Sequence, residues 1–169
     1  GYAELDIGGN VTVAAEASNG AATAYILTLS ASAYSGGTAE ISILGDLTVS
    51  AEGSSAALAY VSYLSAYGYY GDRAEVHIGG DLNVSAEASN GYAYAYVYYL
   101  DASATDGATA KLSIDGNVSI HATGTSGALA YVTYLSAYAE YGQSADLSIG
   151  GDVTVAAHAA DGYAYAYVL

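Results

Sequence analysis

Residues 7–13 read Ile-Gly-Gly-Asn-Val-Thr-Val, a stretch in which one apolar run ends, the chain turns at Gly-Asn, and a second apolar run begins. The pattern recurs, and the units begin near Ile7, Ile43, Ile78, Ile114 and Ile149. The spacings alternate between 36 and 35 residues, so two kinds of unit, A and B, alternate in a double repeat of 71 residues. Self-similarity at a fixed period is the signature of repeat architectures. We therefore predict a single repeat array over residues 1–169.

Neither end of the sequence carries an irregular or polar capping segment. Solenoid proteins normally need caps, because an open end leaves unpaired strand edges. Direct end-to-end stacking would also place an A unit beside another A unit. We therefore expect the array to be a segment of a longer chain or filament.

Inside each unit, apolar and polar residues alternate with a period of two. In the first unit Leu5, Ile7, Val11 and Val13 occupy one face, whereas residues such as Thr12 occupy the other. This alternation is typical of half-buried β-strands. The two short strands meet at a Gly-Asn or Gly-Asp corner, where we expect the positive φ angles that glycine and Asx residues tolerate. A longer third strand follows in every unit.

The order of two short strands, a turn and a long strand predicts an all-β fold, a parallel β-solenoid (β-helix). It would have about five coils of roughly 35.5 residues each. One unit would form one wide coil, with two narrow coils as the alternative. Successive coils would stack as parallel strands in register, so that equivalent residues form columns along the axis. The chain contains no proline, which agrees with strands that donate every backbone N–H to a neighbour.

Charge and composition exclude several classes of function. The formal net charge is −15 with only two basic residues, Arg73 and Lys111, so the chain lacks the cations that nucleic-acid binding needs. There is no cysteine for disulfides or thiolate metal sites, and no stretch resembles a transmembrane helix. Motifs for phosphate, dinucleotide or acyl-transfer chemistry are absent. We identify no catalytic and no cofactor-binding residues, and we predict a protein that is not an enzyme.

Acidic residues fall into two columns of equivalent positions. The first holds the single lysine between two acids: Glu4, Glu40, Glu75, Lys111 and Asp146. The second begins with three carboxylates: Glu16, Glu52, Glu87, Thr123 and His158. Like charges about 4–5 Å apart repel by about 1 kcal/mol in water, and salt or a divalent cation would relieve this repulsion.

Tyrosine provides all the aromatic residues, with 20 Tyr and no Phe or Trp. One tyrosine column has a member in every unit: Tyr25, Tyr60, Tyr96, Tyr131 and Tyr167. A second set lies in the same long strands, two residues after a valine: Tyr63, Tyr99 and Tyr134. Two interpretations apply to the first column, a structural stack of rings or an aromatic surface offered to a partner. So many rings cannot all be enclosed, and an exposed tyrosine-rich patch is typical of a protein–protein interface.

Three further groups of residues could carry chemistry. Asp46, Asp81 and Asp152 occupy the corner column and are candidate Ca²⁺ ligands, although turn chemistry with local backbone N–H groups is the favoured explanation. His77, His121 and His158 fall into three different outward columns, which argues against a shared metal site. Candidate N-glycosylation sequons begin at three asparagines, and the alternative is that these residues only occupy corner and outward positions: Asn10, Asn83 and Asn117.

The stretch 78–88, Ile-Gly-Gly-Asp-Leu-Asn-Val-Ser-Ala-Glu-Ala, and its counterparts resemble the beta-strand repeats of very large secreted bacterial surface proteins. These are loosely similar to filamentous-haemagglutinin-like adhesins, from which this chain differs in its coil length and tyrosine content. The resemblance implies a secreted, cell-surface and non-enzymatic protein.

Together these features lead us to expect an extracellular structural protein that self-associates into a filament, sheath or adhesin stalk. Its partners would be further copies or a longer array, with divalent cations or glycans as further candidates. The alternative is a surface binding module whose tyrosine-rich face recognises a glycan or a partner protein.

Overall fold

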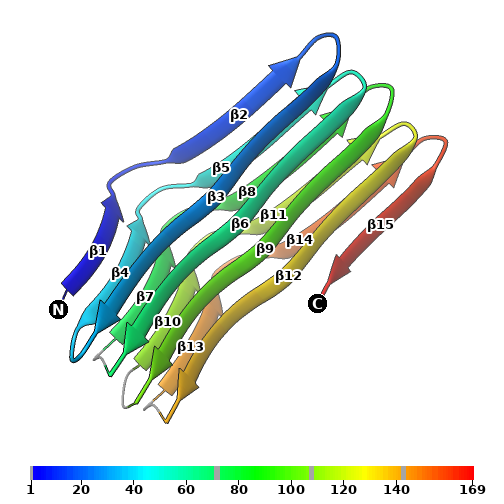
Figure 1. The fold of residues 1–169 in the computed structure, drawn as a ribbon. Helices are drawn as coiled ribbons and strands as arrows, with labels where there is room; N and C mark the ends of the chain where they lie inside the picture. Colours follow the sequence, from blue (N-terminus) through cyan, green and yellow to red (C-terminus); the bar gives the residue numbers. More distant parts are fainter. Residues whose placement is uncertain (1, 71–72, 107–108, 142–143) are drawn as a thin grey trace.

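The structure is a computed structural model that describes residues 2–70, 73–106, 109–141 and 144–169. The described chain folds into fifteen β-strands and forms three five-stranded parallel sheets (Figure 1). The first sheet contains β1 (Tyr2–Ile7), β4 (Thr38–Ile43), β7 (Arg73–Ile78), β10 (Thr109–Ile114) and β13 (Ser144–Ile149). The second contains β2 (Val11–Ala17), β5 (Leu47–Gly53), β8 (Leu82–Ala88), β11 (Val118–Gly124) and β14 (Val153–Ala159). The third contains β3 (Ala21–Tyr34), β6 (Ala56–Tyr69), β9 (Tyr92–Thr105), β12 (Gly127–Glu140) and β15 (Tyr163–Val168).

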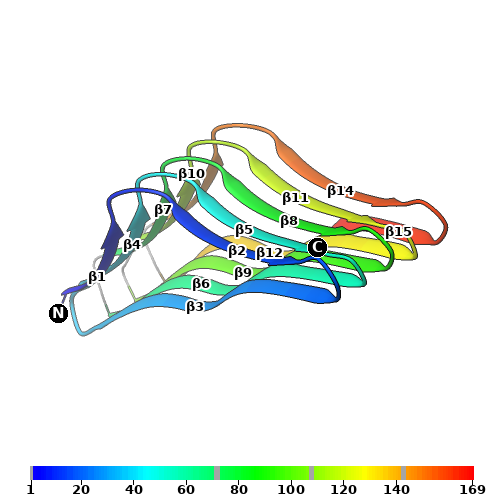
Figure 2. The ribbon, with the colours of Figure 1, turned by 90° about the horizontal axis from the view of Figure 1, so that it is seen from above.

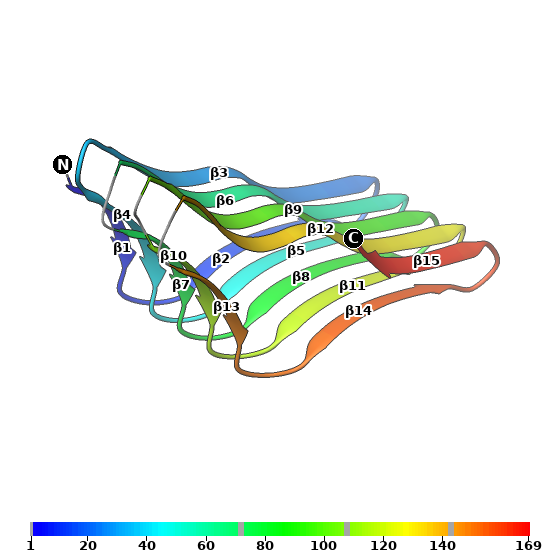
Figure 3. The same cartoon turned by 90° about the horizontal axis from the view of Figure 1, so that it is seen from below.

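Each repeat unit forms one wide coil, which confirms the predicted β-solenoid and settles the choice between one wide and two narrow coils. A coil consists of two short strands on one side and one long strand on the other (Figure 2). The short strands meet at the corner, and the second one converges on the long strand at the far turn (Figures 2 and 3). The three sheets thus enclose one core that is wide near the corner and thin near the far turn.

Strand pairing places equivalent residues of successive coils side by side. Ile7 pairs with Ile43, and Ile43 pairs with Ile78, in parallel register. The same holds in the other two sheets, where Val49 pairs with Val84 and Tyr60 pairs with Tyr96. The predicted columns are therefore real ladders along the axis of the solenoid.

The core consists of aliphatic columns that fit the shape of the coil. Large side chains such as Ile43, Leu47 and Ile78 lie near the corner and are completely buried. Alanines such as Ala51 and Ala86 occupy the thin part of the core near the far turn. Close packing of a core with this taper requires side chains of decreasing volume, which explains why Ala is so frequent on the inward face.

The long strands each carry an irregularity that the sequence contains but simple alternation does not predict. In β6, Val61 and Leu64 both point inward, and the two residues between them lie outward. The register between β6 and β9 accordingly pairs Val61 with Val97 and then resumes at Tyr63 and Tyr99. Because the same shift occurs at residues 27, 62, 98 and 133, the coils still stack in register.

The expectation of positive φ at the Gly-Asx corners is wrong. Positive φ angles in the described residues occur in other turns, at Gly20, Gly36, Ser35, Tyr70, Asp106 and Tyr141. The corner glycine is needed for space: a Cβ on Gly80 would lie 2.1 Å from Oδ1 of Asp46 in the preceding coil. Such a distance is a severe overlap, so only glycine fits beneath the Asx side chain of its neighbour.

The alternation of A and B units has a steric cause at the far turn. The first A unit turns between Ala17 and Ala21, whereas the first B unit turns between Gly53 and Ala56, with one residue fewer. In this tighter turn a Cβ on Gly53 would lie 2.1 Å from the carbonyl oxygen of Ala56. The longer turns of the A units have room for alanine at the last residue of the second strand, as at Ala17. The length of the turn therefore decides whether this position is alanine or glycine.

Candidate functional site

The predicted tyrosine column forms a continuous stack on the outer face of the third sheet. The ring centroids of Tyr25 and Tyr60 are 5.1 Å apart, and those of Tyr60 and Tyr96 are 4.9 Å apart. Tyr96 and Tyr131 follow at 4.8 Å, and Tyr131 and Tyr167 at 5.2 Å. All four pairs are nearly parallel, with interplanar angles of 4–7°. The spacing is that of neighbouring strands, so the backbone ladder itself holds the rings in contact.

A second tyrosine stack runs beside the first. Its members directly follow the unpaired residues 62, 98 and 133 of the long strands. Tyr63 and Tyr99 stack at 5.0 Å, and Tyr99 and Tyr134 stack at 4.5 Å. Thr28 holds the equivalent position in the first coil. The shift turns this column outward, although each member follows a buried valine. Tyr63 is 43% exposed and Tyr134 is 48% exposed, and Tyr99 between them is partly buried.

A third group of tyrosines lies near the far turn, where the sequence analysis assigned no column. Tyr92 and Tyr163 approach to 6.2 Å between ring centroids although a whole coil separates them. Gly127 pairs with both tyrosines in the register and lies between them. Because glycine has no side chain, both rings occupy the space that a Cβ at residue 127 would fill. The signal was present in the sequence as a glycine between two tyrosines in one column.

The outer face of the third sheet, which we call the tyrosine face, is almost free of charge. Its five strands contain two carboxylates, Asp101 and Glu140, and no basic residue. Asp101 accepts a hydrogen bond from the Ser136 hydroxyl, and burial raises the pKa of its carboxyl. Burial raises the pKa of Tyr131 to about 12 and also raises the pKa values of Tyr96 and Tyr99. These phenols therefore stay neutral at physiological pH.

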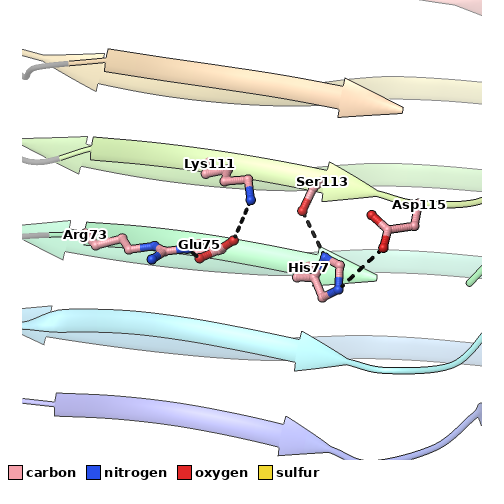
Figure 4. Close-up of polar contacts among 6 residues, drawn as sticks. All are labelled: Arg73, Glu75, His77, Lys111, Ser113 and Asp115. Atoms are coloured by element: carbon pink, nitrogen blue, oxygen red, sulfur yellow. Dashed lines mark hydrogen bonds and ion pairs between the residues drawn. The ribbon is translucent and has the colours of Figure 1, made fainter. Parts of the chain in front are cut away.

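Most carboxylates lie in the other two sheets and in the turns. The predicted register of the first acidic column is confirmed, since Glu40 pairs with Glu75 and Glu75 with Lys111. Glu75 is only 5% exposed, and it forms an ion pair with Arg73 and another with Lys111, whose Nζ lies 3.2 Å from Oε1 (Figure 4). The two basic residues of the chain thus both neutralise Glu75, the one buried carboxylate among the described residues. This cluster stabilises the stack of coils.

The second acidic column also has the predicted register, with Glu16 beside Glu52 and Glu52 beside Glu87. These side chains lie on the exposed outer face of the second sheet, where they line a shallow groove. Unlike the first column, this one contains no Lys or Arg, since Thr123 and His158 are its remaining members. Their mutual repulsion is an exposed, salt-sensitive contribution of about 1 kcal/mol or less for each pair.

The corner aspartates form a hydrogen-bonded ladder. Oδ1 of Asp46 accepts a hydrogen bond of 2.9 Å from the backbone N–H of Asp81, and Oδ1 of Asp81 accepts one of 2.7 Å from that of Asn117. Asn117 in turn accepts one from the N–H of Asp152. The bonds thus run to the next coil, whereas the turn interpretation expected them to stay local. Within the described ranges, no three His, Asp or Glu side chains come together in a way that could hold a metal ion.

The three histidines lie in different columns, as the repeat indicated. Nδ1 of His77 is 3.0 Å from Oγ of Ser113, and its Nε2 is 3.9 Å from Oδ2 of Asp115 (Figure 4). His121 contacts the hydroxyl of Thr123 at 2.9 Å. These contacts join the outward His77 side chain to the next coil. Ser113, its hydrogen-bonding partner, is only 6% exposed.

The three sequon asparagines have different environments. Oδ1 of Asn10 accepts a hydrogen bond from the N–H of Asp46, and the amide of Asn117 donates to Oδ1 of Asp81. Asn83, the second residue of β8, lies outward and is partly exposed. Two of the three side chains are thus parts of the corner ladder.

Comparisons with known proteins add no relative. A scan of protein-family models, a search of curated proteins and a search of solved structures each gave no significant match to the chain. In the part of the chain that the structure describes, no helix has the length and apolar character needed to cross a membrane.

Proposed function

We propose that this chain is a non-enzymatic extracellular structural protein. Its solenoid would serve as a rod that associates laterally with further copies through the tyrosine face, building a filament, sheath or adhesin stalk. The observation that carries the proposal is an almost uncharged face with stacked, exposed tyrosines on a chain of net charge −15.

Electrostatics favours this face as the place of contact. Copies of an acidic chain repel one another wherever their carboxylates approach. The strands β3 and β6 carry no ionisable acid or base other than tyrosine, and β9 carries only Asp101. Two rods that meet through this face bury phenol rings, while all of their carboxylates other than Asp101 and Glu140 lie away from the contact. Tyrosine is enriched in protein interfaces because it combines a large apolar surface with a hydroxyl that forms hydrogen bonds.

The architecture supports a mechanical role. The backbone of every interior strand is hydrogen-bonded to strands of the coils on both sides, and aliphatic columns such as the one through Ile43 and Ile78 run through the core. In a solenoid each coil contacts only its neighbours, so the rod can be extended by adding coils without a change in packing. The resemblance of the repeat to secreted bacterial surface proteins supports the extracellular location.

The alternative is a binding module for a glycan or a partner protein. The rows of exposed phenol hydroxyls favour it, since they repeat at the spacing of the strands. However, aromatic recognition of a sugar uses the faces of the rings, and the faces of Tyr60, Tyr96 and Tyr99 are covered by their stacked neighbours. What the ladders offer is ring edges and hydroxyls, which suits a protein surface better than a sugar.

The experiment compares the oligomeric state of two triple variants by sedimentation and electron microscopy. The test variant, Tyr63→Thr with Tyr99→Thr and Tyr134→Thr, removes the second stack and copies Thr28, the residue that the same column already contains. The control variant replaces three partly buried residues on the outer face of the second sheet: Thr48→Ala, Asn83→Ala and Ser119→Ala. Circular dichroism confirms that each variant is folded.

We expect the wild type and the control to form lateral assemblies that grow with added salt, because salt screens the repulsion between acidic rods. The test variant should remain dispersed under the same conditions. A wild type that stays monomeric at high salt and high concentration would contradict the proposal. Binding of the monomer to a glycan array, lost in the test variant, would favour the alternative.

A further inference from the structure

A tyrosine cluster outside the stacked ladders lies where β3 and β6 end, at the lower left of Figure 1. We call it the edge cluster, and its members are Tyr34, Tyr67, Tyr69 and Tyr70. Its outer rings are accessible, since Tyr34 is 63% exposed and Tyr70 is 54% exposed. Tyr34, Tyr67 and Tyr69 lie at the end of the tyrosine face, outside the two stacked ladders on which the proposed lateral contact rests.

Two ring pairs of the edge cluster meet at steep angles, whereas the ladder rings lie parallel. Tyr34 and Tyr69 are partners in the register of β3 and β6, and their ring centroids are 6.3 Å apart at an interplanar angle of 54°. Tyr70 has a φ of 49°, and its ring packs edge-on against Tyr69 at 4.3 Å and 78°. The hydroxyls of Tyr69 and Tyr70 are 3.5 Å apart. Tyr69 thus meets Tyr34 and Tyr70 at steep angles, whereas Tyr67 lies nearly parallel to it, at 6.3 Å and 21°.

We propose that the edge cluster is a site of oxidative modification, in which Tyr34 and Tyr69 couple to a dityrosine that joins the first two coils. The oxidant is a peroxide, used by a haem peroxidase. Each phenol loses one electron and one proton to become a phenoxyl radical. A carbon–carbon bond then forms between the ring carbons next to the two hydroxyl-bearing carbons. The hydrogens on these carbons move to the oxygens and restore both phenols, while one peroxide takes up the two electrons and two protons and becomes two water molecules.

Geometry selects this pair over the ladders. Coupling requires two ring edges to meet with their planes turned, which the 54° angle between Tyr34 and Tyr69 permits. In the ladders the rings overlap face to face at 3–7°, and a bond would need both rings to leave their stacks. Coupling of Tyr69 with Tyr70 is also disfavoured, because it would close a small ring across a single peptide bond.

The repeat supplies an internal comparison. Thr105 and Glu140 hold the positions equivalent to Tyr34 and Tyr69 in the next A and B units, and they pair in the same register. The site is therefore specific to the first two coils among the described residues. It can be transplanted by replacing two residues, because the backbone at both places is the same.

The test treats dilute, monomeric chain with a haem peroxidase and hydrogen peroxide. Dityrosine is measured by its fluorescence, and the bond is located by mass spectrometry after cleavage at Asp and Glu. This cleavage places Tyr34 in peptide 17–40 and Tyr69 in peptide 53–72. The same peptides contain Tyr25 and Tyr60, so fragmentation of the linked pair assigns the bond to individual tyrosines. We expect one intrachain bond, between Tyr34 and Tyr69, and a chain of monomeric mass that has lost two hydrogens.

Three variants make the result specific. Tyr34→Phe keeps the ring and should lower the dityrosine yield at least fivefold, whereas Tyr99→Phe in the ladder should leave the yield unchanged. The double variant Thr105→Tyr with Glu140→Tyr should roughly double it. Bonds located within the ladders, between Tyr69 and Tyr70, or only between chains would overturn the proposal, and so would an unchanged yield in Tyr34→Phe.

Discussion

Replacing the corner glycine of the third coil, Gly80→Ala, tests how closely the coils stack. The new Cβ would lie 2.1 Å from Oδ1 of Asp46 and 2.9 Å from its backbone nitrogen, both in the preceding coil. The side chain of Asp46 can rotate away, but then it loses the hydrogen bond that it accepts from the N–H of Asp81. The backbone contact remains, so the two coils must also separate slightly.

The expected cost follows from these two effects. Overpacking in a close-packed region costs about 1–3 kcal/mol. A lost hydrogen bond to a carboxylate costs about 1.5–3 kcal/mol where the groups are buried, and the exposure of this corner places it at the lower end. Alanine recovers about 0.4–1 kcal/mol by restricting the unfolded chain. We therefore expect Gly80→Ala to lower the free energy of unfolding by about 2–4 kcal/mol.

The chain provides a matched control in Gly9→Ala, the same column position in the first coil. A Cβ on Gly9 meets no atom within 4 Å, because the described chain has no coil on that side. Its free energy of unfolding should stay within about 0.5 kcal/mol of the wild type or rise slightly. Urea unfolding measures both variants. Equal destabilisation of Gly80→Ala and Gly9→Ala would refute the explanation, because the glycine would then be needed by the corner itself and not by the stack.

Three further perturbations have defined outcomes. Lys111→Ala leaves the buried carboxylate of Glu75 with one cation, so urea unfolding should show a loss of about 1–3 kcal/mol, and no loss would mean that the pair is not formed. Tyr99→Thr removes two stacking contacts and Tyr134→Thr removes one, so the first should cost about 1–3 kcal/mol and the second about half of that; equal costs would speak against the stack. The pKa of Tyr131 is raised from 10.0 to about 12, so its contribution to stability is complete below pH 10 and is lost as the pH rises towards 12. The melting temperature should therefore fall between pH 10 and 12, with a smaller fall in Tyr131→Phe.

The sequence was sufficient to predict the solenoid because the repeat and the alternation act on every coil. Once strands are parallel and in register, the spacing of the units dictates which residues meet, and the tyrosine stack through Tyr60 and Tyr96 follows directly. The acidic column with Lys111 beside Glu75 was predictable for the same reason. What the repeat specifies is which side chains lie next to one another along the axis.

The sequence was not sufficient where the reason for a residue lies in the neighbouring coil. Gly80 was interpreted through its own backbone angle, whereas its reason is the Asp46 side chain beneath it. The burial of Glu75 depends on Arg73 on the same strand, a contact that columns alone do not indicate. The edge cluster depends on the positive φ of Tyr70, which places its ring back against Tyr69. Turn geometry and contacts across columns therefore needed the structure.

The central claim is that equivalent residues lie on neighbouring parallel strands, and pairs of spin labels measure this directly. The chain contains no cysteine, so labels can be attached at single introduced cysteines. The outward column of the second sheet provides the sites, with Thr12→Cys combined with either Ser119→Cys or Thr154→Cys. With about 4.8 Å for each strand, the backbone distances should be about 14 Å and 19 Å, to which the label arms add a constant. A distance to residue 154 that equals or falls below the distance to residue 119 would contradict the stacked solenoid.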